Sequence, residues 1–138
     1  MTPLRRKEII VKITGLNHIT INVTDLTASK AFYGEVLGLE EAGFIDMGDH
    51  RLTYYALPQG VRLELIEYDA PDPVLETSVF HRGIYRHLCL ETDDLEGLAR
   101  RCKEHGITIT KGPGYVEKLG CSNILLIDPN GVEVEVIQ

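Results

Sequence analysis

Short runs of alternating hydrophobic and polar residues predict the strands in the first half of the chain. Residues 16–23 alternate in this way, which is typical of a strand with one buried and one polar face. Three further strands are predicted at residues 40–47, 52–57 and 61–68. Between the first two strands, hydrophobic residues recur at helical spacing, at Ala28, Phe32 and Val36. This helix is expected to begin at a Thr24-Asp25 cap and to end at Gly38.

The second half repeats the same order of predicted elements. Its strands are expected at residues 84–91, 107–110, 123–127 and 132–137. Its helix is predicted from a hydrophobic stripe formed by Leu95, Leu98, Ala99 and Cys102. Residues 111–122 hold three glycines and a proline, so we expect at least part of this stretch to be a loop. The sequence D-P-N-G at residues 128–131 predicts a β-turn.

Two pairs of similar segments indicate a tandem duplication. H-I-T-I-N-V-T-D-L at residues 18–26 matches H-L-C-L-E-T-D-D-L at residues 87–95, an offset of 69 positions (87 − 18). G-V-R-L-E-L-I-E at residues 60–67 matches G-V-E-V-E-V-I-Q at residues 131–138, an offset of 71 (131 − 60). A period this long, present twice, indicates two copies of one supersecondary unit. The predicted fold is therefore α+β, built from tandem βαβββ modules.

The duplication also predicts how the domain is divided. We expect one domain over residues 13–138, made of a first module at 13–68 and a second at 84–138. The connector at residues 69–83 lacks a clear period, although its residues 74–80 could form a helical turn. Residues 1–12 are expected to be an N-terminal extension. A chain of 138 residues is long enough for one such domain with a sizeable core.

Composition excludes several classes of partner. The net charge of −7 argues against nucleic acid, whose phosphates require a basic face, and against an anionic membrane surface. No apolar run approaches the length of a membrane span, and the N-terminal stretch lacks the apolar core of a signal peptide. Three cysteines without a C-x-x-C spacing favour a reducing compartment. We therefore expect a cytoplasmic protein.

Each copy offers one histidine and one glutamate at the same place, His18 with Glu64 and His87 with Glu135. A carboxylate inside an apolar strand is costly unless it is paired or binds a metal. If the first and last strands of each unit are neighbours, these four side chains can gather around one divalent cation. Four protein ligands leave two positions open on an octahedral ion, as in a catalytic site. A single glutamate in a strand more often faces solvent than binds a metal. A single histidine is more often a hydrogen-bonded polar residue than a metal ligand.

Two smaller side chains lie near the predicted ligands. Thr20 and Cys89 each follow a ligand histidine by two residues and share its face of the strand. Either could line a substrate cavity, and simple packing is the alternative. Mixed nitrogen and oxygen ligands suit Ni, Co, Mn, Fe and Zn, so the sequence predicts one divalent ion without naming it.

The chain resembles the vicinal oxygen chelate superfamily, which includes glyoxalase I, methylmalonyl-CoA epimerase, extradiol dioxygenases and bleomycin-binding proteins. The resemblance covers nearly all of residues 13–138 and rests on the motifs L-N-H-I-T-I-N-V, F-Y-G-E-V-L-G-L, L-E-L-I-E, R-H-L-C-L-E-T-D-D-L and D-P-N-G-V-E-V-E-V-I. It implies a cup-shaped mixed sheet around a metal held by His18, Glu64, His87 and Glu135. Because dioxygenase-type members lack a carboxylate at the position of Glu64, the glyoxalase and epimerase branches are favoured.

In these branches a metal holds two oxygens on adjacent carbons, and a base removes the proton between them to give an enediolate that the metal stabilises. The resemblance therefore implies a metal-dependent, glyoxalase-like lyase or isomerase of the lactoylglutathione-lyase-like group. Its substrate would be a small α-oxygenated carbonyl compound. The resemblance allows either Glu64 or Glu135 to be the base, and Glu135 is the residue predicted here. A homodimer is expected, because such modules often complete their sheets or sites across a two-fold axis.

Two positions depart from the pattern of bacterial glyoxalases. Asn22 stands where an arginine holds glutathione, and Tyr68 stands where an asparagine does. The usual glutathione anchors are therefore missing, and Asn22 and Tyr68 join Thr20 and Cys89 as candidate substrate-binding residues.

Three alternatives follow from the same resemblance. The first is a methylmalonyl-CoA-epimerase-like enzyme, whose segment after the ligand is similar to L-E-L-I-E-Y-D-A-P-D-P and whose extra base would fall near Asp49 or His50. The second is an extradiol dioxygenase-like enzyme. The third is a metal-free antibiotic-binding protein, against which the complete set of predicted ligands counts.

Overall fold

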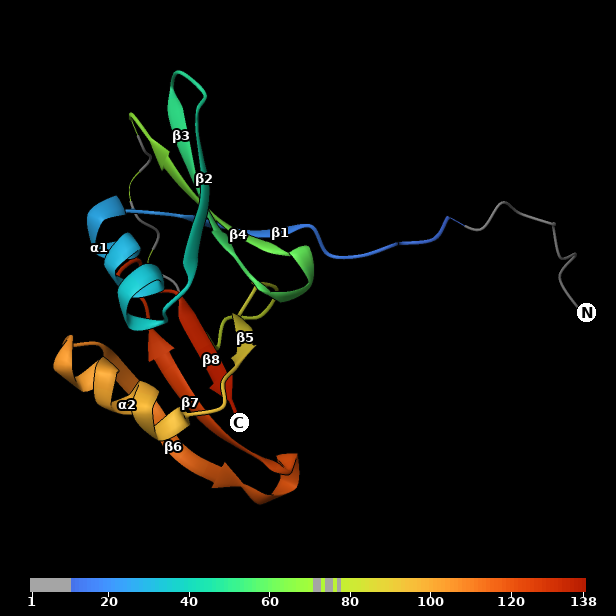
Figure 1. Ribbon diagram of the computed structural model, residues 1–138, viewed down its shortest axis with the longest axis vertical. Coiled ribbons are helices and arrows are strands. Elements are labelled where there is room, and N and C mark those ends of the chain that lie inside the picture. Colours follow the sequence, from blue (N-terminus) through green and yellow to red (C-terminus); the bar gives the residue numbers. More distant parts are fainter. Residues whose placement is uncertain (1–10, 71–72, 74–75, 77) are drawn as a thin grey trace, which may run out of the picture.

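The computed structural model describes residues 11–70, 73, 76 and 78–138 of the chain. The first module contains, in order, β1 (His18–Asn22), α1 (Leu26–Lys30), the π-helix η1 (Ala31–Val36), β2 (Glu40–Asp46), β3 (His50–Ala56), the 3₁₀ turn η2 (Pro58–Gly60) and β4 (Arg62–Tyr68). Residues 11–17 run outward from the start of β1 (Figure 1). Asp25 begins the helix as predicted, since its side chain accepts a hydrogen bond from the Ala28 backbone N–H at 3.0 Å.

The second module repeats this order. It contains β5 (His87–Glu91), α2 (Leu95–Glu104), β6 (Thr108–Val116), the 3₁₀ turn η3 (Glu117–Leu119), β7 (Cys121–Ile127) and β8 (Glu133–Ile137). Asp94 caps α2 by accepting from the Gly97 backbone N–H at 2.9 Å. The predicted α+β fold with tandem βαβββ units is confirmed.

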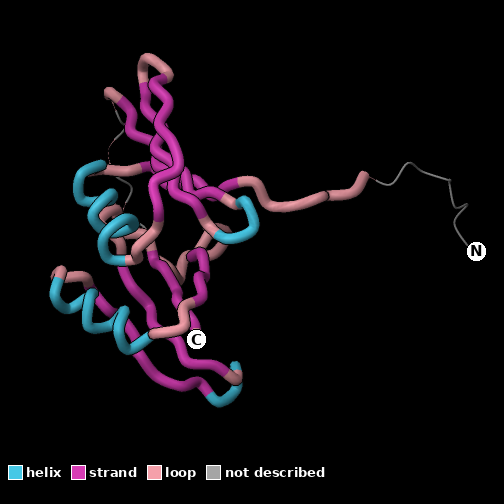
Figure 2. Tube along the Cα trace, in the orientation of Figure 1, coloured by secondary structure: helices cyan, strands magenta, loops and turns pink. Residues whose placement is uncertain are grey.

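Each module folds its strands into one four-stranded mixed sheet (Figure 2). The strand order is β1-β4-β3-β2 in the first sheet and β5-β8-β7-β6 in the second. The first and last strands of each module are therefore neighbours, and both pairs run parallel. This pairing is the condition under which a histidine on the first strand and a glutamate on the last can share one face of the sheet.

The helices cover the apolar faces of the two sheets and lie on the same side of the molecule (Figure 1). The side chains that β4 and β8 turn toward this core are almost completely buried, namely Leu63, Leu65, Val134 and Val136. Glu64 and Glu135 alternate with them and point to the opposite face, as the period of two predicted. None of the helices in the described part of the chain is long and apolar enough to cross a membrane.

Two predicted boundaries are wrong. The strand expected at residues 107–110 continues as β6 to Val116, so the loop expected within residues 111–122 is confined to the turn at residues 117–120, before β7 begins at Cys121. Gly112 and Gly114 lie at a β-bulge, where the register between β6 and β7 shifts between Lys111 and Gly114. The strand predicted from residue 84 begins only at His87. The helical turn considered for residues 74–80 falls partly outside the described residues.

A buried polar cluster joins the two modules. The Tyr33 hydroxyl of η1 donates to Asp128 Oδ2 at 2.7 Å, and Tyr33 is 0% exposed. Asp128 Oδ1 also accepts from the backbone N–H groups of Asn130 and Val132, both at 2.8 Å, which shapes the D-P-N-G turn. Asn130 in turn donates to Ser29 on α1 at 3.0 Å. The predicted turn thus exists, and it also serves as the polar contact between the modules.

We expect Tyr33→Phe to lower the free energy of unfolding by about 1.5–3 kcal/mol, because a hydrogen bond to a buried carboxyl group is lost. Burial, followed by the negative charge and hydrogen bond of Asp128, raises the pKa of Tyr33. The unfolded chain loses this proton above about pH 10 while the folded protein keeps it, so wild-type stability should fall as the pH rises through that value.

Urea unfolding of both proteins between pH 7 and pH 11 measures these effects. The decline above pH 10 should be smaller in Tyr33→Phe, and the exposed Tyr115→Phe provides a matched control. Equal stability of Tyr33→Phe and wild type at pH 7 would contradict the contribution assigned to this hydrogen bond.

Candidate metal centre

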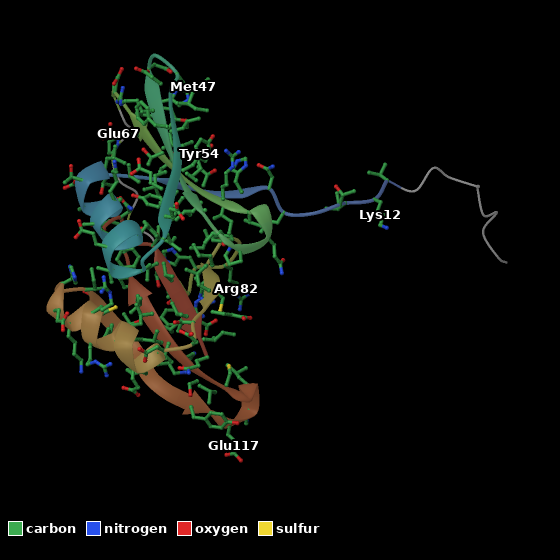
Figure 3. All side chains as sticks on the ribbon, in the orientation of Figure 1. Lys12, Met47, Tyr54, Glu67, Arg82 and Glu117 are labelled. Atoms are coloured by element: carbon green, nitrogen blue, oxygen red, sulfur yellow. The ribbon has the colours of Figure 1, made fainter. Side chains whose placement is uncertain are left out.

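The first module presents Glu64 on the polar face of its sheet. Thr20 lies opposite Glu64 in the parallel β1–β4 register, and its hydroxyl donates to Glu64 Oε1 at 3.0 Å. Tyr54 lies in the body of the first sheet (Figure 3), and its hydroxyl donates to Glu64 Oε2. Glu64 is only 7% exposed, so these two hydroxyl donors compensate for the removal of its carboxylate from water.

His18 lies two residues before Thr20 on the same strand face, and its register partner on β4 is Arg62. The residue is exposed, and its Nδ1 lies 2.7 Å from Oδ1 of the neighbouring Asn17. An amide oxygen only accepts hydrogen bonds, so Nδ1 carries the proton in this arrangement. The Nε2 lone pair of His18 is therefore available to an ion.

The second module brings His87 and Glu135 together on the polar face of its sheet. His87 Nε2 lies 3.4 Å from Glu135 Oε1. The Asn123 side-chain amide, on the neighbouring strand β7, donates to Glu135 Oε2 at 2.9 Å. On the other side of the ring, His87 Nδ1 lies 2.5 Å from Oε1 of Glu133. Cys89 is the register partner of Glu135 on β5.

The electrostatic surroundings keep both carboxylates of β8 ionised near neutral pH. The hydrogen bond from Asn123 is the main cause that lowers the pKa of Glu135, and it outweighs desolvation. Burial works to raise the pKa of Glu133, but the hydrogen bonds from Arg86 and His87 together bring it below its ordinary value. Burial and the neighbouring Glu135 raise the pKa of Cys89 to about 12, so Cys89 is a neutral thiol at physiological pH.

The donor set of the second module fits a cation. When the His87 ring is neutral, Glu133 accepts from its Nδ1, and the lone pair of Nε2 faces the carboxylate oxygen of Glu135. Two acceptors that converge at 3.4 Å repel each other unless a positive charge lies between or beside them. A divalent ion with mixed imidazole and carboxylate ligands satisfies both atoms.

The structure places the predicted ligands in two pairs rather than in one cluster: His87 and Glu135 lie in contact, whereas His18 and Glu64 lie on neighbouring strands of the first sheet. We use half-site for His18 with Glu64 in the first module, and for His87 with Glu135 in the second. Within the described part of the chain, no three His, Cys, Asp or Glu side chains are placed to hold one ion. The joining of the two half-sites around a single ion therefore stays a prediction.

Two of the four candidate substrate-binding residues contact a half-site, and the other two lie at the ends of strands. Thr20 contacts Glu64 directly, and Cys89 interacts with Glu135. Asn22 is exposed at the end of β1, opposite Ile66. Tyr68 lies at the end of β4, where its ring stacks on His50 with 5.0 Å between the ring centroids. The His50 Nδ1 lies 2.6 Å from Asp49 Oδ1, so this end of the first sheet carries its own carboxylate–imidazole pair.

A cavity of about 510 Å³ lies between the modules and reaches Cys89. Its apolar lining is formed by Leu37, Leu39, Leu57, Leu90, Leu98 and Val136. Gln59, Glu91 and Thr92 supply polar groups at its wall. The cavity thus has both apolar and polar walls, and it reaches the second half-site through Cys89.

Sequence reasoning missed the side chains that hold the ligands in place. Glu133 precedes Glu135 by two residues, so the period of a strand puts both carboxylates on one face, and this signal was available. Arg86, adjacent to His87, donates from Nε to Glu133 Oε1 at 2.9 Å. Tyr54 and Asn123 come from the middle strands of the two sheets, and no local pattern marks their contact with a glutamate.

A family model described as Glyoxalase/Bleomycin resistance protein/Dioxygenase superfamily matches residues 15–136. The ethylmalonyl-CoA/methylmalonyl-CoA epimerase of Cereibacter sphaeroides is 33% identical over 137 residues, which covers 91% of this chain and 98% of that protein.

Solved structures of similar fold include enzymes and a binding protein. The trypanothione-dependent glyoxalase I of Leishmania major has a TM-score of 0.69 at 25% identity, with 91% of this chain and 87% of that chain covered. TnmS3, an antibiotic-binding protein from a Streptomyces species, has a TM-score of 0.69 at 21% identity, with 92% and 97% covered. At that identity, the second likeness concerns the fold alone.

Proposed function

The chain belongs to the Glyoxalase/Bleomycin resistance protein/Dioxygenase superfamily, and from this premise we propose that it is a metal-dependent isomerase or lyase. It would remove a proton next to a carbonyl group of a small molecule. The observation that carries the proposal is the convergence of His87 Nε2 and Glu135 Oε1 at 3.4 Å, repeated in outline by His18 and Glu64 on the equivalent strands.

Four residues would hold the ion, namely His18, Glu64, His87 and Glu135. A divalent ion bound there would neutralise the negative charge that develops on the carbonyl oxygen when the neighbouring proton leaves. Ni, Co, Mn, Fe and Zn all suit this ligand set. The chain's own residues must then supply the base, the orientation of the substrate and the exclusion of water.

Glu135 is the residue that we assign as base. Both oxygens of Glu64 accept hydrogen bonds from hydroxyl groups, those of Thr20 and Tyr54, so both are already engaged within the first sheet. Glu135 is held by the Asn123 amide on Oε2, and its Oε1 faces His87. Oε1 is thus the carboxylate oxygen that can turn toward a substrate while Asn123 keeps the other oxygen in place.

The substrate class that we infer first is a branched malonyl-type thioester. The relative at 33% identity is named as an epimerase of ethylmalonyl-CoA and methylmalonyl-CoA, and reversible loss of the α-proton is the simplest route to such an inversion. The leucine side chains that line the cavity beside Cys89 suit a short alkyl branch. An α-oxygenated carbonyl compound is the second candidate, favoured by the likeness to glyoxalase I at 25% identity.

We also infer a cytoplasmic homodimer in which two copies bring the half-sites together. The half-sites belong to different modules, and three ligands do not meet within the described part of one chain. A two-fold axis can pair the first module of one copy with the second module of its partner, and it creates two equivalent sites. Closure of the two modules within one chain is the alternative arrangement.

Exchange of the α-proton with solvent tests the proposed function. We expect the protein to exchange the α-proton of methylmalonyl-CoA for deuterium in D₂O, because the base returns a solvent-derived proton. Chelator should abolish the exchange, and addition of Co²⁺ or Ni²⁺ should restore it. Proton NMR of the thioester measures the exchange, and a hemithioacetal and a catechol complete the substrate panel.

Two results would contradict the proposal. One is exchange that proceeds at the same rate with and without chelator. The other is the absence of turnover on the whole panel together with tight binding of an aromatic antibiotic that ignores the metal, which would indicate a binding module.

A further inference from the structure

Glu133 is a buried carboxylate that the proposed chemistry does not use. It is 3% exposed, although a carboxylate is rarely taken out of water to this extent without partners. Two groups contact its Oε1, the Arg86 Nε at 2.9 Å and the His87 Nδ1 at 2.5 Å. Arg86 Nη2 lies 3.5 Å from the other oxygen. The contact with His87 therefore belongs to a connected chain from guanidinium to carboxylate to imidazole.

An ionised carboxylate only accepts hydrogen bonds, and the Arg86 ion pair keeps Glu133 in that form. The ring nitrogen beside it must therefore carry a proton, so in the neutral ring Nε2 of His87 is the unprotonated nitrogen, and it faces Glu135. A carboxylate that holds the far nitrogen of a ligand histidine in this way fixes the tautomer and the orientation of the ring.

The duplication supplies an internal comparison. Glu133 is the register partner of His87, whereas the register partner of His18 is Arg62. A guanidinium cannot accept a proton from an imidazole, and that of Arg62 stacks over the Tyr54 ring at 4.2 Å instead. His18 relies on the side chain of its own neighbour Asn17. The two predicted ligand histidines are thus held by different means, one by a buried carboxylate that is paired with Arg86 and one by an exposed amide.

We propose that Glu133, held by Arg86, is a positioning residue that keeps His87 in the Nδ1-protonated tautomer and makes the second half-site the preorganised half of the metal centre. The part of this proposal that concerns the metal rests on the proposed function. The part that assigns the tautomer applies to the metal-free protein and does not depend on the proposed function.

Nitrogen-15 NMR of the imidazole rings in the metal-free protein, at about pH 8 where a histidine is neutral, tests the tautomer. We expect wild-type His87 to show protonated Nδ1 and unprotonated Nε2. A glutamine at position 133 keeps the size of the side chain but offers a donor as well as an acceptor, so Glu133→Gln should show a mixture of the two tautomers.

Titration of the same proteins with Co²⁺ tests the consequence for the metal. Loss of such an orienting partner typically weakens metal binding about 10–100-fold, and we expect this loss in Glu133→Gln. Glu67→Gln is the matched control, because Glu67 forms a similar pair with the Arg51 Nε at 3.1 Å away from both half-sites. The control should keep the wild-type affinity and the wild-type His87 spectrum.

The outcomes separate this inference from the proposed function. Nε2-protonated His87 in the wild type, which needs no variant to fold, would overturn the inference. So would an unchanged His87 spectrum or an unchanged Co²⁺ affinity in Glu133→Gln. Wild-type protein that shows the expected tautomer but binds no divalent ion would instead refute the proposed function and the metal part of the inference, and it would leave the tautomer assignment supported.

Discussion

Glu135→Gln is expected to keep its metal ion and to lose most of its turnover. Glutamine preserves the shape of the side chain and one oxygen ligand, but it cannot take up the substrate proton. Removal of a general base typically costs about 10²–10⁴-fold in rate, so the α-proton exchange should fall by that factor. The Asn123 amide that now donates to Oε2 can still contact the glutamine oxygen, which limits the structural change.

Glu64→Gln is the matched comparison for this experiment. Its carboxylate accepts from two hydroxyl groups, so we expect weaker metal binding as the main effect and near-normal exchange once the ion is saturating. Metal content and exchange rate must be measured on the same preparations. If both variants keep their metal and near-normal turnover, neither carboxylate is the base. The Asp49–His50 pair at the end of the first sheet would then be the next to test.

His87→Ala and His18→Ala are each expected to strip the ion. An ion present at 100 times its dissociation constant stabilises the folded protein by about 2.7 kcal/mol, and this metal-dependent part of the stability should disappear in both variants. Thermal unfolding with and without Co²⁺ measures it. His105→Ala is the control, because His105 lies at the C-terminal end of α2, where it caps the helix. Full metal occupancy and unchanged metal-dependent stability in both variants would remove these histidines from the site.

Much of the fold could be predicted because its signals are local. Alternating residues marked β1, β4 and β8, and Asp25 and Asp94 marked the starts of both helices. The repeat placed equivalent strands in both halves. That the first and last strands of each unit are neighbours was only a condition of the site prediction, and the β1–β4 and β5–β8 pairs meet it. The length of β6 could not be predicted from such local patterns. Glycines that break a regular strand are accommodated there by a bulge, and only the pairing with β7 reveals it.

The candidate site was predictable only in part, for a related reason. The duplication singled out His18, Glu64, His87 and Glu135 because it repeats their positions. It gives no information on side chains that occur in one copy only, such as Glu133, where the first copy has Arg62. Tyr54 and Asn123 reach the glutamates from the middle strands, so their contacts depend on the register between strands rather than on any sequence motif. The two copies therefore differ at the residues that support the predicted ligands.

Calorimetric titration of the metal-free protein with Co²⁺ tests the central claim most directly, namely that two half-sites share one ion. We predict saturable binding with a stoichiometry of one ion per chain, abolished by His18→Ala and by His87→Ala alike. Two ions per chain, with each histidine variant losing only one of them, would show that the half-sites act separately. That result, or the absence of saturable binding, would contradict the account.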